Sequence, residues 1–547
     1  MPDGEASGGQ QGEPPAKPDG EASDGGQGEP PAKPDGESAE PPTKPEGEAA
    51  DGQQGESSAA PEGEGGMPAG TEATLTIDDE SLIVVSENGE EAEGGFEDIQ
   101  EGSLLTLTVG DDGTSVTKIE VGDALISTGP GAGQAPYAMS EPPAKPDGEA
   151  SDSQGGPGGA SSEPNSGSGA TSFTEEASES DGIYDSTESD VSAIMASEGA
   201  DVALANVTVT KTGDSSSSGD SDFYGLNAGV VATDGANLAL DGGTVTTDAQ
   251  GANGVFAYGE GTQVSVSDLQ ISTSKGNSGG IEVAGGATLS ASNLTVETQG
   301  QSSAAIRRDR GGGTETVTGG SYTTHGTSSP AIYCTADVTV SDATLLAENS
   351  EGIVIEGFNS VTLENDDVTG NVNGNATRTD VVPNVMIYQS MSGDAEEGTG
   401  TFSMEGGSFT ASSGTLFYVT NTSAVVNMEG VDLDIADDLL IVAGNEGQWG
   451  KEGSNGGTVD FTASDQVLSG NITVDELSSL ALKLAGSSSY EGAVNSNGQA
   501  GDVSIELSEG CTWTLTADSY VSALSGDTAG IDLYGHALYV NGEAWSA

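Results

Sequence analysis

The sequence predicts a parallel β-helix, an all-β solenoid with about 25 residues in each turn. One apolar residue recurs at spacings of 25, 26, 25, 26 and 21 residues, at Val230, Val255, Ile281, Ile306, Ile332 and Ile353. An eight-residue unit follows each of them, in which apolar residues alternate on both sides of one turn residue. Repetition at this period is typical of solenoids, and alternation among β-branched residues indicates strands.

The turn residue of the unit forms a column of its own, namely Asn206, Gly242, Asp268, Asn293, Gly319, Asp342 and Asn365. Asn, Asp and Gly tolerate left-handed backbone, so we expect a bend at this position in every turn. Stacking at about 4.8 Å per turn would align the apolar positions into one core. Calcium binding by the column is a weaker interpretation, because neutral Asn and Gly dilute the charge, and we expect no cofactor.

The first part of the chain has a different composition. Of the 21 prolines, only Pro330 and Pro383 follow residue 170. The phrase EPPAKPDGEAS at 13–23 recurs in variant form at 29–39 and 40–50, and unchanged at 141–151. Because such segments have few apolar groups to offset the entropy of ordering, we expect a disordered acidic tether over 1–70 and a disordered linker over 129–180.

Between these segments, residues 71–128 alternate like the strands of a small β module. Turn signals at 87–89 and 111–113 separate the apolar runs, and the second signal predicts a hairpin. The stretch EDIQEGSLLTLTVGDDGTSVTKIEV resembles small β-barrel modules of bacterial surface proteins. We therefore expect a small barrel or meander here.

The β-helix itself is expected over 181–440, followed by further turns and a cap over 441–547. From about residue 440 the strict period is lost, and Trp513, Tyr539 and Trp545 appear. The last turn of a solenoid exposes unpaired strand edges, so an aromatic-covered end is what capping requires.

Charge and cysteine content limit the class of partner. The chain has 13 Lys and Arg against 89 Asp and Glu, a net charge of −76. Such a field repels phosphate backbones and anionic lipids, so nucleic acid is not an expected partner. No apolar run is long enough to span a membrane. Cys334 and Cys511 would lie about 30 Å apart in one solenoid, so we expect two separate thiols. We also expect the protein to be a monomer.

Three arginines stand together in this acidic chain. Arg307, Arg308 and Arg310 flank Asp309 beside a run of three glycines. One interpretation is that they bridge acidic residues of adjacent turns. Another is that they hold a carboxylate or sulfate of an acidic glycan, and a third is that one of them is catalytic.

Three longer loops, at 211–227, 369–401 and 444–457, interrupt the regular turns and carry Tyr224, Tyr388 and Trp449. Loop aromatics either stack on sugar rings or fold back onto the scaffold, and both interpretations stay open.

Adjacent acidic pairs such as Asp366 and Asp367 have the wrong geometry for a two-acid mechanism unless they lie in a bend. Threonine pairs suggest an ice-binding array, but Ser265 and Ser267 interrupt it.

Residues 183–547 resemble secreted, adhesin-like right-handed parallel β-helix proteins of gut-dwelling bacteria. The resemblance lies in phrases such as FYGLNAGVVATDGA (223–236), SSAAIRRDRGGGT (302–314), SPAIYCTADV (329–338) and EGCTWTLTADSY (509–520). It implies the fold and an extracellular setting, but no activity for any residue. The fold also resembles that of pectate lyases, and fold alone does not select a function.

We therefore expect an extracellular or cell-surface scaffold that binds glycans or surface partners without catalysis. A polysaccharide lyase or glycoside hydrolase, and a purely structural surface rod, are the alternatives. The first residues show no signal sequence, and an acidic spacer there is what a lipid-anchored surface protein would need after its anchor.

Overall fold

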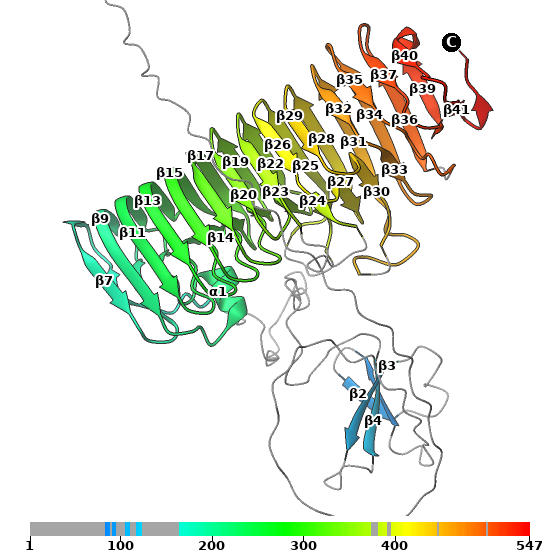
Figure 1. The fold of residues 1–547 in the computed structure, drawn as a ribbon. Helices are drawn as coiled ribbons and strands as arrows, with labels where there is room; N and C mark the ends of the chain where they lie inside the picture. The colour runs from blue at the N-terminus through cyan, green and yellow to red at the C-terminus, as the bar shows by residue number, and fades with distance from the viewer. Residues whose placement is uncertain are drawn as a thin grey trace, which may run out of the picture. The chain divides into compact units, whose positions relative to one another are not determined.

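The computed structural model describes residues 164–372, 381–390, 395–445, 448–498 and 501–546, together with four strands between residues 83 and 122 (Figure 1). The chain divides into two compact units, Met1–Ile126 and Ser127–Ala547. Each is described by itself. The expected tether over 1–70 lies outside the described residues.

The first unit contains a four-stranded sheet in the order β2-β1-β4-β3. Its strands are β1 (Ile83–Glu87), β2 (Glu90–Glu93), β3 (Leu104–Val109) and β4 (Val116–Gly122). Antiparallel pairing of β3 with β4 confirms the hairpin predicted at 111–113, and β1 and β2 form a second hairpin. The central β1 and β4 are parallel, so the expectation of a meander was wrong.

The second unit is a parallel β-helix, as predicted (Figure 1). One side, called sheet I, is a stack of twelve short strands. They are β5 (Ser168–Phe173), β8 (Val191–Ala196), β10 (Val230–Ala232), β12 (Val255–Tyr258), β14 (Ile281–Ala284), β16 (Ile306–Arg308), β18 (Ile332–Cys334), β21 (Ile353–Glu356), β24 (Pro383–Tyr388), β27 (Thr415–Thr420), β30 (Leu440–Val442) and β33 (Ile472–Val474).

The other two sides, sheet II before the bend and sheet III after it, share five long strands. These are β9 (Asp201–Thr212), β11 (Asn237–Asp248), β13 (Gln263–Thr273), β15 (Ala287–Thr298) and β17 (Gly313–Thr324). Sheet II continues in β6 (Ala177–Ser180), β19 (Asp337–Ser341), β22 (Ser360–Glu364), β25 (Thr399–Glu405), β28 (Ser423–Glu429), β31 (Thr458–Ser464), β34 (Ser479–Ala485), β36 (Asp502–Leu507) and β39 (Ala523–Gly526). Sheet III continues in β7 (Ile183–Ser186), β20 (Thr344–Ala347), β23 (Asp367–Gly370), β26 (Ser408–Ala411) and β29 (Asp432–Ile435).

The bend between sheets II and III confirms the predicted turn column. Asn206, Asp268, Asn293, Asp342 and Asn365 have φ between 51° and 58°. Gly242 and Gly319 have φ of 71° and 65°. Pairing between turns skips these positions, so Leu240 pairs with Val266 and Gly243 with Leu269. The left-handed residue therefore turns the chain without shifting the register of the ladder.

The core consists of side chains that point inward from all three sheets. The predicted column pairs turn by turn, from Val230 with Val255 to Ile332 with Ile353. Every residue of that column is fully buried. Polar residues replace apolar ones at three inward positions of a single turn, namely Arg308, Glu315 and Tyr322.

Buried hydroxyl groups form hydrogen bonds with the backbone at the corner between sheets III and I. Thr247, Thr273 and Thr298 each donate to the carbonyl of the residue five positions later. Ser278 and Ser303 accept the backbone N–H of the preceding turn. The corner backbone is thus paired although it leaves the strands.

The β-helix begins before its expected N-terminal boundary, and the further turns expected after residue 440 are present. It begins with β5 at Ser168, inside the segment expected to be a linker. Beyond residue 440 the pairing continues, with Val459 on Leu480 and Leu480 on Val503. The turns there differ in length, with 35 residues from Ala424 to Val459 and 21 from Val459 to Leu480, which is why the sequence period is lost.

The C-terminal end carries two small sheets. One is β32 (Val467–Ser469), β35 (Ser489–Glu491), β37 (Thr512–Thr514) and β40 (Ile531–Asp532), and the other is β38 (Ser519–Val521), β41 (Leu538–Val540) and β42 (Glu543–Ala544). A 3₁₀ turn spans Thr528–Gly530. Tyr520 and Tyr539 stack with ring centroids 4.7 Å apart, and Trp513 is buried against Tyr490.

Cys334 and Cys511 are both buried and free, as expected. In the described part of the chain, no helix combines the length and hydropathy that a membrane span needs.

Substitutions at the bend between sheets II and III test whether the left-handed backbone there is required for stability. Asp268→Val should lower the free energy of unfolding by about 1–2 kcal/mol, because a β-branched residue is strained at a φ of 51°. Asp268→Gly should change it little. Denaturant unfolding followed by circular dichroism measures both. Gln270→Val, on the exposed face of the same strand, is the matched control, and equal losses for the two valine variants would contradict the bend.

Candidate functional site

The three arginines do not form one surface patch. Arg307 and Arg308 are neighbours on β16, and neighbouring side chains of a strand point to opposite faces. Arg307 lies on the outer face of sheet I, whereas Arg308 points into the core and is fully buried. The cluster read from the sequence is therefore split by the strand itself.

A helical insertion covers the outer face of sheet I beside Arg307. Residues 211–227 contain the helix α1 (Ser218–Tyr224), which Ser217 caps at its N-terminus and Gly225 ends at a φ of 72°. A side chain at Gly225 would collide with Phe256 of β12, so the close approach requires glycine. Phe223 of α1 and Phe256 are both buried.

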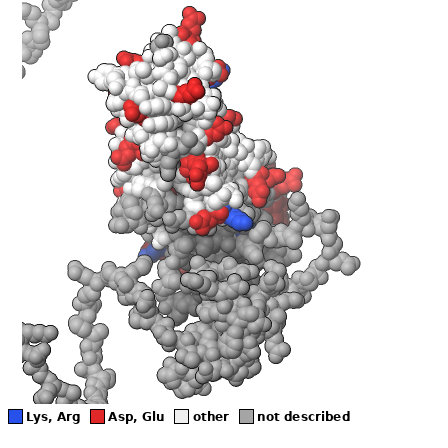
Figure 2. All heavy atoms as spheres, turned by 90° about the vertical axis from the view of Figure 1, so that its right-hand side faces the viewer, with Lys and Arg blue, Asp and Glu red and all other residues white. Residues whose placement is uncertain are grey.

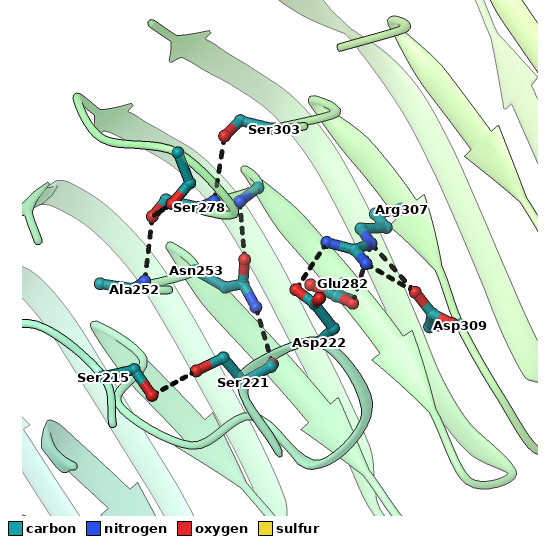
Figure 3. Close-up of polar contacts among 12 residues, drawn as sticks. Ser215, Ser221, Asp222, Ala252, Asn253, Ser278, Glu282, Ser303, Arg307 and Asp309 are labelled. Carbon is teal, nitrogen blue, oxygen red and sulfur yellow. Dashed lines mark hydrogen bonds and ion pairs between the residues drawn. The ribbon is translucent and has the colours of Figure 1, made fainter. Parts of the chain in front are cut away.

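Polar contacts fix this insertion to the turns beneath it (Figure 3). Asn253 donates from Nδ2 to the carbonyl of Ser221 at 3.1 Å and accepts the backbone N–H of Gly279 at 2.6 Å. At the start of the insertion, Lys211 is buried and donates from Nζ to the carbonyls of Glu188 and Gly213. Burial lowers the pKa of Lys211 to about 8, although Asp190 and Asp214 oppose the shift.

Arg307 connects the insertion to sheet I through three carboxylates (Figure 3). Nη1 lies 3.1 Å from Asp222 of α1, and Nη2 lies 2.8 Å from Asp309. Nε lies 3.3 Å from Glu282, on the preceding strand β14. The side chains of Glu282 and Asp309 are 0% and 1% exposed, and that of Arg307 is 12% exposed. The guanidinium is therefore occupied by residues of the chain itself.

Charge and burial act in opposite directions in this cluster. Burial raises the pKa of Glu282 well above its usual value, and the nearby guanidinium of Arg307 only partly offsets this. Burial disfavours the charged form of Arg307, but the carboxylates around it raise its pKa overall. Three acids around one guanidinium therefore place Glu282, whose pKa burial raises, beside Asp309. Such a pair has the right residue types for acid and base chemistry, but it is enclosed.

Arg310 and Tyr224 lie at the edge of the same region. The Arg310 guanidinium lies over the ring of Phe223, 4.0 Å from its centroid. Tyr224 meets the ring of Tyr258 edge-on, with centroids 5.3 Å apart. Both side chains are half-buried, as is that of Arg307, so these three of the predicted site residues retain partial access to solvent.

Tyr388 and Trp449 are buried in a separate cluster farther along sheet I. Their rings are 4.9 Å apart and tilted by 59°. The hydroxyl of Tyr388 donates to Glu356 at 3.0 Å, and that of Tyr333 donates to the same oxygen at 2.9 Å. Tyr388 ends strand β24, so the expectation that it lies on a loop was wrong. The geometry of both rings favours contact with the scaffold over contact with a sugar.

Sequence reasoning missed the buried acids Glu282, Glu315 and Glu356. Glu315 replaces a residue that is apolar in both neighbouring turns, Leu289 and Val338, and that replacement was a signal in the sequence. Glu282 and Glu356 gave no such signal, because Glu282 pairs with Arg307 on one side and Glu356 pairs with Tyr388. Asp366 lies in the bend, the case that the sequence left open, and it accepts the backbone N–H groups of Ala343 and Glu364. Burial raises its pKa to about 6. Asp367 points outward and is exposed, so the two do not form a catalytic pair.

A groove runs over the outer face of sheet II, in a region that the sequence had not singled out. Its volume is about 240 Å³, and it spans β22, β25, β28 and β31. One column along it consists of Thr362, Ser403, Asn427 and Thr462. The parallel column contains Glu364, Glu405 and Glu429, in register on successive turns.

The hydroxyl column of this groove extends toward the N-terminal turns through Thr339, Thr316, Ser290 and Ser265. Thr208 and Thr244, two of the threonines that suggested an ice-binding array, belong to sheet III. Ser265 and Ser267 therefore continue a hydroxyl face rather than interrupting one threonine array.

Comparisons of the chain with protein-family models and with curated proteins give no match. Among the described residues, no group of three or more His, Cys, Asp and Glu side chains is arranged to hold a metal ion.

Replacing Arg307 tests its role as a clamp. Arg307→Met should lower the free energy of unfolding by about 3–5 kcal/mol, because it leaves buried carboxylates without their cation. The insertion at 211–227 should also become more sensitive to proteases. Lys275→Met, which removes an exposed ion pair with Asp248, should cost about 0–1 kcal/mol. Thermal unfolding and limited proteolysis give the comparison, and equal effects would exclude the clamp.

Glu315 predicts a pH dependence of stability. Burial raises its pKa from 4.5 to about 8, against the opposing effect of Arg308. Below pH 4.5 both states are protonated, and between 4.5 and 8 only the unfolded chain ionises. The free energy of unfolding should therefore fall with rising pH over this window, by about 1.4 kcal/mol per unit.

Glu315→Gln should remove this contribution to the slope. Urea unfolding at several pH values between 5 and 7.5 measures the slope, and Glu297→Gln, at an exposed position, should keep that of the unmodified chain. An unchanged slope in Glu315→Gln would mean that the buried carboxyl is ionised in the folded protein.

Proposed function

We propose that this protein is an extracellular or cell-surface scaffold that binds glycans along the outer face of sheet II, without catalysis. The groove over β22, β25, β28 and β31 is the observation that carries the proposal. It is open, its outward side chains are polar, and these side chains recur in register from turn to turn.

The spacing of the groove suits an extended polymer. Successive turns lie about 4.8 Å apart, so hydroxyl, amide and carboxylate groups recur along the axis at that interval. Sugar hydroxyls both donate and accept hydrogen bonds. Carboxylates such as Glu405 accept such bonds strongly, and Ser403 and Asn427 supply both donors and acceptors. A linear glycan lying along the axis would meet equivalent partners at each turn.

Charge selects among glycans. The outward carboxylates Glu364, Glu405 and Glu429 line one side of the groove. On the face shown in Figure 2, acidic side chains are spread over the described surface and basic ones are few. Arg307 is occupied by three acids, and Arg308 is inside the core. These facts favour glycans without carboxylate or sulfate groups over the acidic glycans suggested by the arginine cluster.

A polysaccharide hydrolase or lyase is the second candidate. The observation in its favour is Glu282, whose raised pKa beside Asp309 resembles the acid and base pairing of glycosidases. Because both carboxyls are at most 1% exposed, a substrate would reach them only if the α1 insertion moved. The groove needs no such rearrangement, and binding is therefore preferred.

A panel of polysaccharides tests both candidates. Immobilised neutral glycans such as galactomannan and xylan should retain the protein, whereas polygalacturonate and sulfated mucin glycans should not. Glu405→Ala should weaken retention about tenfold, because a hydrogen bond to a charged group contributes about 1.5–3 kcal/mol. Glu297→Ala, an exposed carboxylate on sheet III, is the control.

If Glu405→Ala leaves glycan binding unchanged, or if the protein prefers the anionic glycans, the groove is not the binding site. New reducing ends or unsaturated products would favour the enzyme instead. If every glycan fails and the protein forms filaments, the structural rod is the better explanation.

A further inference from the structure

One turn of the β-helix has a polar interior. In the register between turns, Arg308 occupies the position of Val283, and Glu315 that of Leu289. Tyr322 occupies the position of Val296. All three side chains are at most 1% exposed, so none of their polar atoms reaches solvent.

Several polar atoms in this interior have no partner within the protein. Arg308 donates from Nη1 to the carbonyl of Asp337, but its Nε and Nη2 donate to nothing. Neither carboxyl oxygen of Glu315 has a hydrogen-bond partner, nor does the hydroxyl of Tyr322. Folded proteins rarely leave such groups unsatisfied, and several in one turn require an explanation.

We propose that this turn encloses a binding site for water, in which one or more water molecules bridge the Arg308 guanidinium, the Glu315 carboxyl and the Tyr322 hydroxyl. Arg308 and Glu315, both in the described part of the chain, make no direct hydrogen bond to each other. Where two buried polar groups do not contact each other directly, a water molecule that hydrogen-bonds to both is the simplest way to satisfy them.

Water suits this mixture of groups better than an ion does. Arg308 offers donors only, the Glu315 carboxyl offers acceptors and, when protonated, one donor, and Tyr322 offers both. An anion would satisfy the guanidinium but would leave Glu315 unpaired, in a chain that is already strongly negative. A cation would do the reverse. A water molecule donates and accepts, so it satisfies both sides at once.

The neighbouring turns close the site. Val283, Leu289 and Val296 lie on one side. Cys334, Val338 and Leu345 occupy the same positions on the other side, and all six residues are buried. The enclosed water should therefore exchange slowly and be well ordered.

A high-resolution crystal structure of the full chain tests the site directly. We expect density within hydrogen-bonding distance of Arg308 Nε or Nη2 and of Glu315 or Tyr322, both in the unmodified chain and in Glu315→Gln. An empty interior, or a direct contact between Arg308 and Glu315, would overturn the proposal. So would an anomalous signal at the site after a bromide soak, because it would identify an anion.

Thermal unfolding supplies a second test through variants that copy the preceding turn. Arg308→Val and Glu315→Leu should each lower the unfolding midpoint, because each leaves its partner and the water poorly satisfied. The double variant should recover most of the loss, because the interior then matches the apolar turn beside it. Purely additive losses would exclude the coupling. The exposed pair Lys483 and Glu506 is the control, and its variants should be additive and mild.

Discussion

The structure depends on the hydrogen-bonded ladder between successive turns. Each strand pairs in parallel with its equivalent one turn later, and the pairing skips the left-handed residue at the bend. Because this residue absorbs the change of direction, a sequence that varies elsewhere keeps one register from turn to turn. Equivalent side chains are thereby placed in columns, and every column faces either the core or the solvent along its whole length.

The alignment of equivalent side chains into columns accounts for both the apolar core and the groove on sheet II. Inward columns are apolar, so their burial stabilises the stack. Outward columns repeat whatever residue the sequence supplies, which is how Glu364, Glu405 and Glu429 come to line one side of a groove although they are far apart in the chain. Like charges at this spacing repel one another, so three glutamates in register on successive turns do not stabilise the stack.

Departures from the columns lie at two places that share one strand. On the outer side of β16, Arg307 holds the α1 insertion through Asp222, Glu282 and Asp309. On its inner side, Arg308 introduces charge into the core. The two arginines form one cluster in the sequence. Because successive side chains of a strand point to opposite faces, the two have unrelated roles in the structure. The outer one fixes an insertion, and the inner one makes a turn polar.

The sequence by itself determined the solenoid, the register of the column from Val230 to Ile353 and the bend from Asn206 to Asn365, because a period of alternating residues is local information. Tertiary structure alone decided which polar groups meet. Nothing local brings Asp222 of α1 to Arg307, 85 residues later. Burial of Tyr388 and Trp449 likewise depends on loops folding back over sheet I. Contacts between insertions and turns follow from packing in three dimensions, which a repeat pattern does not encode.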